Sequence, residues 1–128
     1  MKKQHVVIVG HGPLPEALKA SAEMIAGDLP NVETVGLNAG EEPTHYRDRV
    51  LQALGENSDV LILSDLRGGT PDNVAAAIAR RREKTWVVNG ASLALVLEAA
   101  MGDVELSVRG LQDLAEVSAA VLTFAPST

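Results

Sequence analysis

The sequence of 128 residues contains no cysteine. This absence excludes disulfides, thiolate metal ligands and a cysteine nucleophile, and it is typical of proteins of the reducing cytosol. Aromatic residues make up only 2% of the chain, which disfavours a platform on which bases or sugar rings stack. No apolar run approaches the roughly 20 residues that a membrane-spanning helix needs. We therefore expect a cytoplasmic protein that does not insert into a membrane.

Positive charge is also scarce, since 17 acidic residues face 11 basic ones and the formal net charge is −6. Nucleic-acid binding depends largely on neutralising phosphates, so we expect no nucleic-acid partner. An acidic surface suits a protein partner that docks through cations. The length and the 46% hydrophobic content allow one packed core, so we expect a single domain over residues 1–128.

Short apolar runs alternate along the chain with segments of helical periodicity. The runs lie at residues 6–9, 32–37, 60–63 and 85–88, and the helical segments at 15–26, 46–54, 70–82 and 93–101. Runs without alternation are typical of strands buried on both faces of a parallel sheet. The pattern predicts an α/β, doubly wound, mainly parallel sheet of order 2-1-3-4 with helices on both faces. Beyond residue 102 the signal weakens, and a helix over 110–118 and a short C-terminal edge strand over 121–124 are the interpretations that fit.

In such a sheet, ligands bind beyond the carboxyl ends of strands 1 and 3. His11 follows the first strand within Gly10-His11-Gly12, and Asp65 follows the third. A carboxylate bonded to one ring nitrogen of a histidine fixes the tautomer and leaves the other nitrogen nucleophilic. The topology therefore predicts that His11 accepts a group and that Asp65 orients its ring.

The loop after Asp65 leads into a helix through Gly68, Gly69 and Thr70. The free N–H groups and the dipole at such a helix start favour phosphate, so these three residues are the predicted phosphate-binding set. Each feature alone has an ordinary explanation as a loop histidine, a turn residue or a helix start. Their coincidence at one switch point favours phosphoryl acceptance on His11.

Other kinds of site fit the sequence less well. It has neither a phosphate-binding loop ending in Gly-Lys-Ser/Thr nor a Gly-x-Ser-x-Gly nucleophile elbow. His5 and His45 lack metal-ligand spacing to His11, so we expect no metal site. The run over residues 80–82, three arginines, is interpreted as a solvated helix end.

The residues around these loops resemble the IIA domain of the mannose family of the bacterial phosphoenolpyruvate-dependent sugar phosphotransferase system. Residues 7–12 are similar to the family's first strand and phosphorylated histidine, and residues 22–27 to the end of its first helix. Residues 65–73 match the family's most specific motif, Asp-x-x-Gly-Gly-[Ser/Thr]-Pro-x-Asn. The likeness extends over nearly the whole chain.

The resemblance implies a histidine-phosphorylated carrier with no cofactor beyond the transient phosphohistidine. His11 would take a phosphoryl group on Nε2 from the phosphocarrier protein HPr and pass it to a IIB component. Asp65 would bond the other ring nitrogen, and Thr70 with the neighbouring amides would bind the phosphoryl oxygens. It also implies a homodimer in which a C-terminal strand is exchanged between subunits.

The chain departs from the family pattern at several places. Arg67 and Asp72 stand where the family usually or often has apolar residues, and residues 90–95 keep only the glycine of its Gly-x-Asn-x-Pro-Met segment. The C-terminal segment is also shorter than usual, which leaves the exchanged strand open. Two other functions remain as alternatives: a phosphocarrier that feeds dihydroxyacetone kinase, and a regulatory anion-sensing module on the same fold. The sequence does not indicate which sugar is served, or whether the carrier serves transport or regulation.

Overall fold

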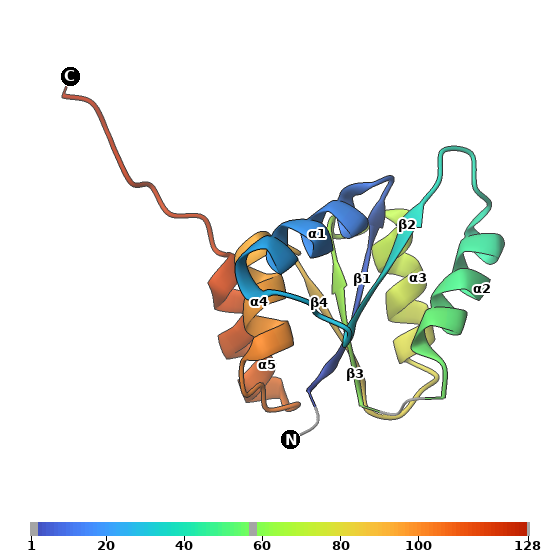
Figure 1. The fold of residues 1–128 in the computed structure, drawn as a ribbon. Coiled ribbons are helices and arrows are strands. Elements are labelled where there is room, and N and C mark those ends of the chain that lie inside the picture. The colour runs from blue at the N-terminus through green and yellow to red at the C-terminus, as the bar shows by residue number, and fades with distance from the viewer. Residues whose placement is uncertain (1–2, 57–58, 128) are drawn as a thin grey trace.

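A computed structural model describes residues 3–56 and 59–127 (Figure 1). The elements in chain order are β1 (His5–His11), α1 (Leu14–Ala26), β2 (Val32–Leu37), α2 (Pro43–Leu54), β3 (Val60–Ser64), α3 (Thr70–Ala79), β4 (Thr85–Asn89), α4 (Leu93–Met101), α5 (Val108–Ala115) and the 3₁₀ turn η1 (Glu116–Ser118). The strands form one parallel sheet of order β2-β1-β3-β4. The predicted α/β class and strand order are confirmed. Within the described ranges, no helix is both long enough and apolar enough to cross a membrane.

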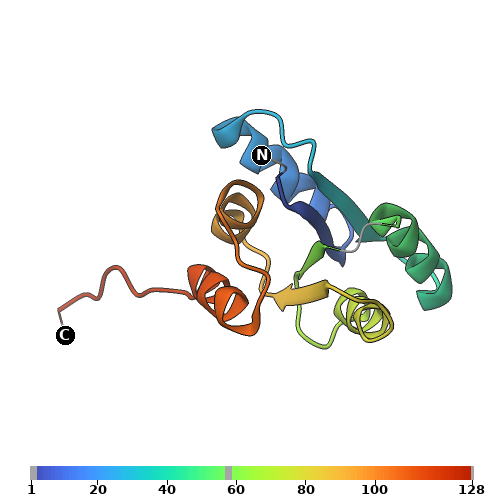
Figure 2. The same cartoon turned by 90° about the horizontal axis from the view of Figure 1, so that it is seen from below.

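The sheet is a central layer with helices on both faces (Figure 2). Val6 and Ile8 of β1 pack into the cluster that includes residues of α4 and α5, whereas Val7 and Val9 pack into the cluster beneath α2 and α3. All four side chains are fully buried. Burial of both faces explains why the sequence of β1 shows no alternation of polar and apolar residues.

Helix boundaries follow from local chemistry. The hydroxyl of Ser92 accepts a hydrogen bond from the Leu95 amide at the start of α4, and Ser107 does the same for the Gly110 amide in α5. Helix α1 ends at Gly27, whose φ of 79° is the left-handed conformation that glycine adopts at little cost. Helix α3 ends at Ala79 rather than near residue 82, because the amides of Arg81 and Arg82 bond three residues back and tighten the chain into turns.

The predicted edge strand over residues 121–124 is wrong for the single chain. Residues 119–127 have no regular structure and project from the body as a tail (Figure 1). Val121, Leu122 and Phe124 are 77%, 81% and 77% exposed. Strand formation needs a neighbouring strand to bond, and no strand among the described residues pairs with the tail.

Strand β1 is also longer than expected and includes His11, which the sequence placed in a loop. Its last two residues continue the ladder with β2, where Gly10 pairs with Gly36 and His11 with Leu37. The chain then turns over Gly36 so closely that a β-carbon there would collide with the carbonyl oxygen of Gly12. The amide of Gly12 donates to the Leu37 carbonyl at 2.8 Å. His11 therefore belongs to the sheet, at the carboxyl end of the central strand β1. Its pairing with Leu37 holds its backbone more firmly than a loop would.

Candidate active site

His11 and Asp65 meet at the carboxyl ends of the two central strands. Oδ2 of Asp65 accepts hydrogen bonds from the main-chain amide of His11 at 2.9 Å and from its Nδ1 at 3.0 Å. The Asp65 side chain is 8% exposed and that of His11 is 46% exposed. Because the carboxylate binds Nδ1–H, the neutral ring keeps its proton there and leaves the lone pair of Nε2 available.

Two glycines make room for this pair. A β-carbon at Gly10 would lie 2.9 Å from Cγ of Asp65, and one at Gly69 would lie 2.8 Å from Cε1 and 3.4 Å from Nε2 of His11. The Nε2 side of the ring therefore faces Gly69, the N-cap residue of α3. The structure thus brings together His11, Asp65 and the start of α3, as the topology predicted.

The sequence predicted free N–H groups at the start of α3, but two of these groups are already hydrogen-bonded within the chain. The amide of Gly68 donates to Oδ2 of Asp72 at 3.0 Å, and that of Gly69 donates to the Leu66 carbonyl at 3.1 Å. Pro71 has no N–H to offer. Thr70, the first residue of α3, contributes a hydroxyl for which no bond to a described residue is found. The two glycines therefore supply space beside His11, and Thr70 supplies a hydrogen-bond donor.

Residues that the sequence analysis did not assign to the site lie directly behind this loop. Ser64 is fully buried, and its hydroxyl donates to Oδ1 of Asp72 at 2.5 Å. Asn89 donates through Nδ2 to Oγ of Ser64 at 3.0 Å. The departure of Asp72 from the family pattern was the one signal that pointed here. Arg67, the other departure, is exposed on the rim of the loop.

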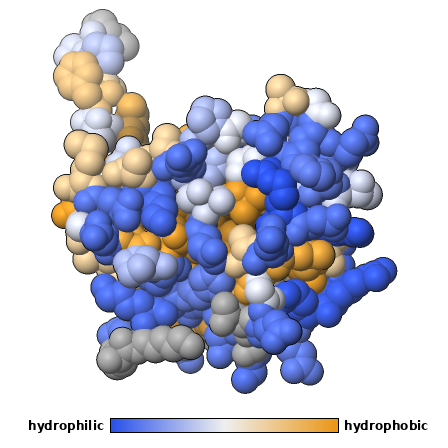
Figure 3. All heavy atoms as spheres, turned by 45° about the vertical axis from the view of Figure 1, so that its right-hand side comes forward, coloured by the Kyte–Doolittle hydropathy of each residue, from blue (hydrophilic) through white to orange (hydrophobic). Residues whose placement is uncertain are grey.

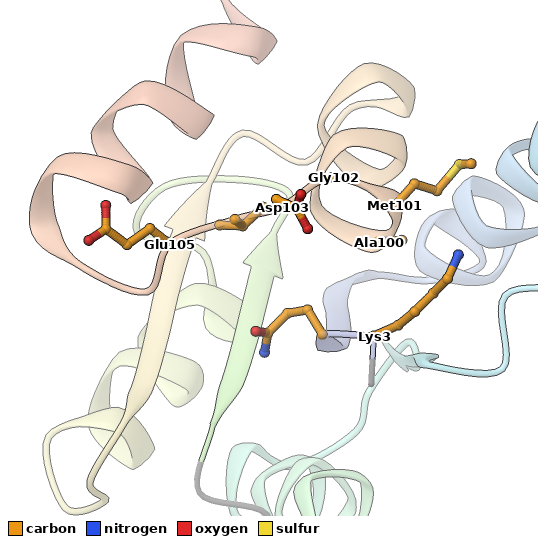
Figure 4. Close-up of a pocket in the computed structure, with 8 residues that line it drawn as sticks. Lys3, Ala100, Met101, Gly102, Asp103 and Glu105 are labelled. Carbon is orange, nitrogen blue, oxygen red and sulfur yellow. The ribbon is translucent and has the colours of Figure 1, made fainter. Parts of the chain in front are cut away.

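The remaining histidines lie elsewhere. His5 stands at the opposite end of β1 with its Nε2 2.6 Å from a carboxylate oxygen of Glu33, and Nδ1 of His45 is 2.6 Å from Glu41. A cavity of about 450 Å³ also lies at the amino ends of the strands, between Gln4 and the turn after α4 (Figure 4). It holds no histidine and is far along the sheet from His11, so it is not part of the site.

Comparisons with known proteins identify the family to which the chain belongs. The family model EIIA-man, described as the fructose IIA component of the phosphotransferase system (PTS), matches residues 5–116. The sorbose-specific EIIA component of Lacticaseibacillus casei is 32% identical over 108 residues, which cover 83% of this chain and 78% of that protein. The fructose-specific EIIA component of Bacillus subtilis is 38% identical over 96 residues, which cover 73% of this chain and 66% of that protein.

A solved structure from the same family has the same fold as this chain. The mannose/sorbose-specific IIA subunit of the phosphotransferase system from Enterococcus faecalis superposes with a TM-score of 0.86 at 28% identity, over 99% of this chain and 100% of that one. The matched residues 5–116 include both strand ends and the whole of the α3 loop. The chain therefore belongs to the mannose-family IIA components of the sugar phosphotransferase system.

Proposed function

We propose that this chain is a phosphoryl carrier that accepts phosphate from phospho-HPr on Nε2 of His11 and passes it to a IIB component in the cytoplasm. The observation that carries the proposal is the pairing of Nδ1 with Asp65, which turns the opposite nitrogen toward the start of α3. The half-exposed ring can be reached by a second protein, as an exchange between two histidines requires.

In the transfer, the Nε2 lone pair of His11 attacks phosphorus as the bond to the donor's histidine breaks. The His11 ring becomes positively charged while Nδ1 keeps its proton, and the Asp65 carboxylate stabilises that charge. Gly68 and Gly69 leave space for the phosphoryl oxygens, the hydroxyl of Thr70 donates to them, and the positive end of the α3 dipole attracts their charge. The reverse displacement by a IIB nucleophile restores neutral His11. The phosphoryl group is carried on the imidazole itself, so the proposal requires no metal or organic cofactor.

Two other functions would use the same fold. A phosphocarrier for dihydroxyacetone kinase is disfavoured because that subfamily tends to lack the Gly-Gly-Thr-Pro loop, which is present here at residues 68–71. A module that only senses anions would bind phosphate without forming a covalent bond. Neither alternative explains better why Nδ1 of His11 is held by a carboxylate while Nε2 faces the helix start.

Incubation with phosphoenolpyruvate, enzyme I and HPr distinguishes these functions. We expect the chain to gain one phosphate that is labile in acid and stable in base, as phosphohistidine is, and only when HPr is present. Transfer of the label onward to IIB proteins, against dihydroxyacetone kinase, then separates the two kinds of carrier. No covalent label under these conditions would contradict the proposal and favour the sensor.

Arg67 is expected to hinder docking of the donor. HPr-type partners present cations beside their own histidine, and Arg67 places another cation on the exposed rim where the family prefers an apolar side chain. Arg67→Leu should lower the KM for phospho-HPr about two- to fivefold with little change in kcat. Steady-state kinetics measures this, and Arg109→Leu on α5 gives the same change of charge away from the site as a control.

Salt dependence provides a second measurement of the same docking. The acidic surface should attract the donor, so KM should rise between 0.1 and 1 M salt as the Debye length falls from about 10 to about 3 Å.

For the Arg67→Leu variant itself, two results would contradict a role in hindering docking. A raised KM for phospho-HPr, or a fall in kcat alone, would instead place Arg67 among the phosphate-binding groups.

We further propose that two copies associate through the C-terminal tail. Strand β4 is an edge strand with an open hydrogen-bonding side, and the tail carries exposed apolar side chains (Figure 3). Pairing of one chain's tail with the other chain's β4 would give the open side of β4 hydrogen-bonding partners and would bury the apolar side chains of the tail. It agrees with the exchanged strand that the resemblance implies.

The double variant Leu122→Asp and Phe124→Asp should raise the dimer dissociation constant at least about 100-fold. Each buried side chain contributes roughly 1.5–3 kcal/mol, and 1.4 kcal/mol is a tenfold change in affinity. Sedimentation velocity measures the mass against that of the 13.4-kDa single chain. Met24→Asp, at an 87% exposed position of α1, is the control and should leave the dimer intact. A monomeric wild type would refute the association.

A further inference from the structure

Asp72 lies in the first turn of α3, and its carboxylate points back under the loop that precedes the helix. Oδ2 accepts the amide of Gly68 at 3.0 Å, and Oδ1 accepts the hydroxyl of Ser64 at 2.5 Å. Nδ2 of Asn89 lies 3.4 Å from the same Oδ1. An acidic residue at this position can stabilise the helix through its charge alone, and it would then need none of these three hydrogen bonds.

The partners of Asp72 come from the ends of two strands. Ser64 is the last residue of β3 and Asn89 the last residue of β4, and the two are paired across the sheet. Ser64 also accepts, through its carbonyl, the amides of Gly90 and Ala91 at 2.9 Å each. The carboxylate thus joins the loop beside His11 to the rigid part of the sheet.

The carboxylate is held in its ionised form by this arrangement. Burial alone raises the pKa of Asp72, but the bonds from Ser64, Gly68 and Asn89 and the charge of Arg67 lower it more, so that the pKa lies below its ordinary value. The bonds to Asp72 are therefore fully formed at neutral pH. Without the carboxylate, the fully buried hydroxyl of Ser64 and the amide of Gly68 would both lose their acceptor.

The loop that Asp72 holds is the one that borders the reacting nitrogen. Gly68 adopts a φ of 80°, and the next residue, Gly69, stands where a single β-carbon would come within 3.4 Å of Nε2 of His11. A shift of about 1 Å at this place is enough to cost roughly a hundredfold in rate at a catalytic site. The position of Gly68 therefore bears directly on where Thr70 meets the phosphoryl group.

We propose that Asp72 is a positioning residue, whose carboxylate fixes the 65–69 loop and the start of α3 relative to His11. It touches neither the phosphoryl group nor His11, and it acts through Gly68. This inference rests on the proposed phosphoryl transfer for its kinetic consequence, but the restraint on Gly68 exists whether or not transfer occurs.

Two measurements on Asp72→Ala, which removes both acceptor oxygens, test the proposal. The first is the kinetics of transfer from phospho-HPr, in which we expect kcat to fall about 10- to 100-fold while KM changes less than about twofold, because the loop is misplaced but the docking rim is kept. The second is hydrogen exchange of the Gly68 amide by NMR, which should become at least about tenfold faster. Asp113→Ala on the exposed face of α5 makes the same substitution away from the site and should match the wild type in both.

A second variant, Ser64→Ala, removes one hydrogen bond of the same cluster and keeps the Asp72 carboxylate. It removes one hydrogen bond that lowers the Asp72 pKa, so the Gly68 amide resonance should titrate at a higher pH than in the wild type. Wild-type kcat in Asp72→Ala would overturn the proposal, and so would unchanged exchange of the Gly68 amide. A wild type that accepts no phosphate would instead refute the proposed function, and Gly68 exchange would then decide the role of Asp72 by itself.

Discussion

His11→Ala should abolish phosphorylation by phosphoenolpyruvate, enzyme I and HPr, because no other described side chain at the carboxyl ends of the strands offers a nucleophilic nitrogen held by a carboxylate. The fold should survive the change, since the side chain is 46% exposed and contributes little to the core. Radiolabel incorporation measures the first effect and circular dichroism the second. We expect incorporation below the detection limit with an unchanged thermal midpoint.

His5→Ala and His45→Ala are the matched controls, because each removes one imidazole that is also hydrogen-bonded to a carboxylate. His5 lies at the amino end of β1 and His45 on the first turn of α2, so neither lies at the carboxyl ends of β1 and β3 beside the start of α3. Both variants should accept phosphate at the wild-type rate. Normal labelling of His11→Ala, or loss of labelling in either control, would move the acceptor away from His11.

Asp65→Asn should slow phosphoryl transfer roughly 10- to 1000-fold. The main-chain amide of His11 requires an acceptor 2.9 Å away, so the side-chain oxygen of asparagine should take the place of Oδ2 and still accept Nδ1–H. The ring then keeps its orientation but loses the negative charge that stabilises the imidazolium. Single-turnover rates from rapid quench measure the loss.

A matched control separates the loss of this charge at the site from a general change of surface charge. Asp48→Asn, at a 71% exposed side chain on α2, removes a charge outside the site and should leave the transfer rate unchanged. Wild-type single-turnover rates in Asp65→Asn would show that Asp65 serves only to shape the turn.

The sheet order and the pairing of His11 with Asp65 could be predicted because both depend on patterns that are local in sequence. Unbroken apolar runs such as residues 60–63 identify buried strands, and parallel topology then brings the ends of strands 1 and 3 together. The prediction of a strand at 121–124 is wrong because strand formation there depends on a partner strand, which local sequence does not reveal. The composition of these residues favours extended backbone, but a strand also needs an edge to bond, and composition does not show where that edge is.

The cluster around Asp72 could not be predicted for a different reason. Ser64 and Asn89 are 25 residues apart, and they meet only because β3 and β4 pair in one particular register. A shift of one residue would turn either side chain to the other face of the sheet. The sequence marked Asp72 as unusual, but its partners depend on that non-local pairing. Likewise, the need for glycine at positions 10 and 69 becomes clear only once Asp65 and His11 are in place.

On the proposed function, the half-exposed ring of His11 limits how long a phosphoryl group persists on it. A site that closes over its substrate keeps water out, whereas a ring open enough to meet two successive proteins is open to water as well. A phosphorylated His11 would therefore lose its group slowly to hydrolysis whenever no acceptor arrives. On the proposed function, such an open site favours rapid relay of phosphate over its storage, and the phosphorylated fraction of the protein would follow the current supply of phospho-HPr.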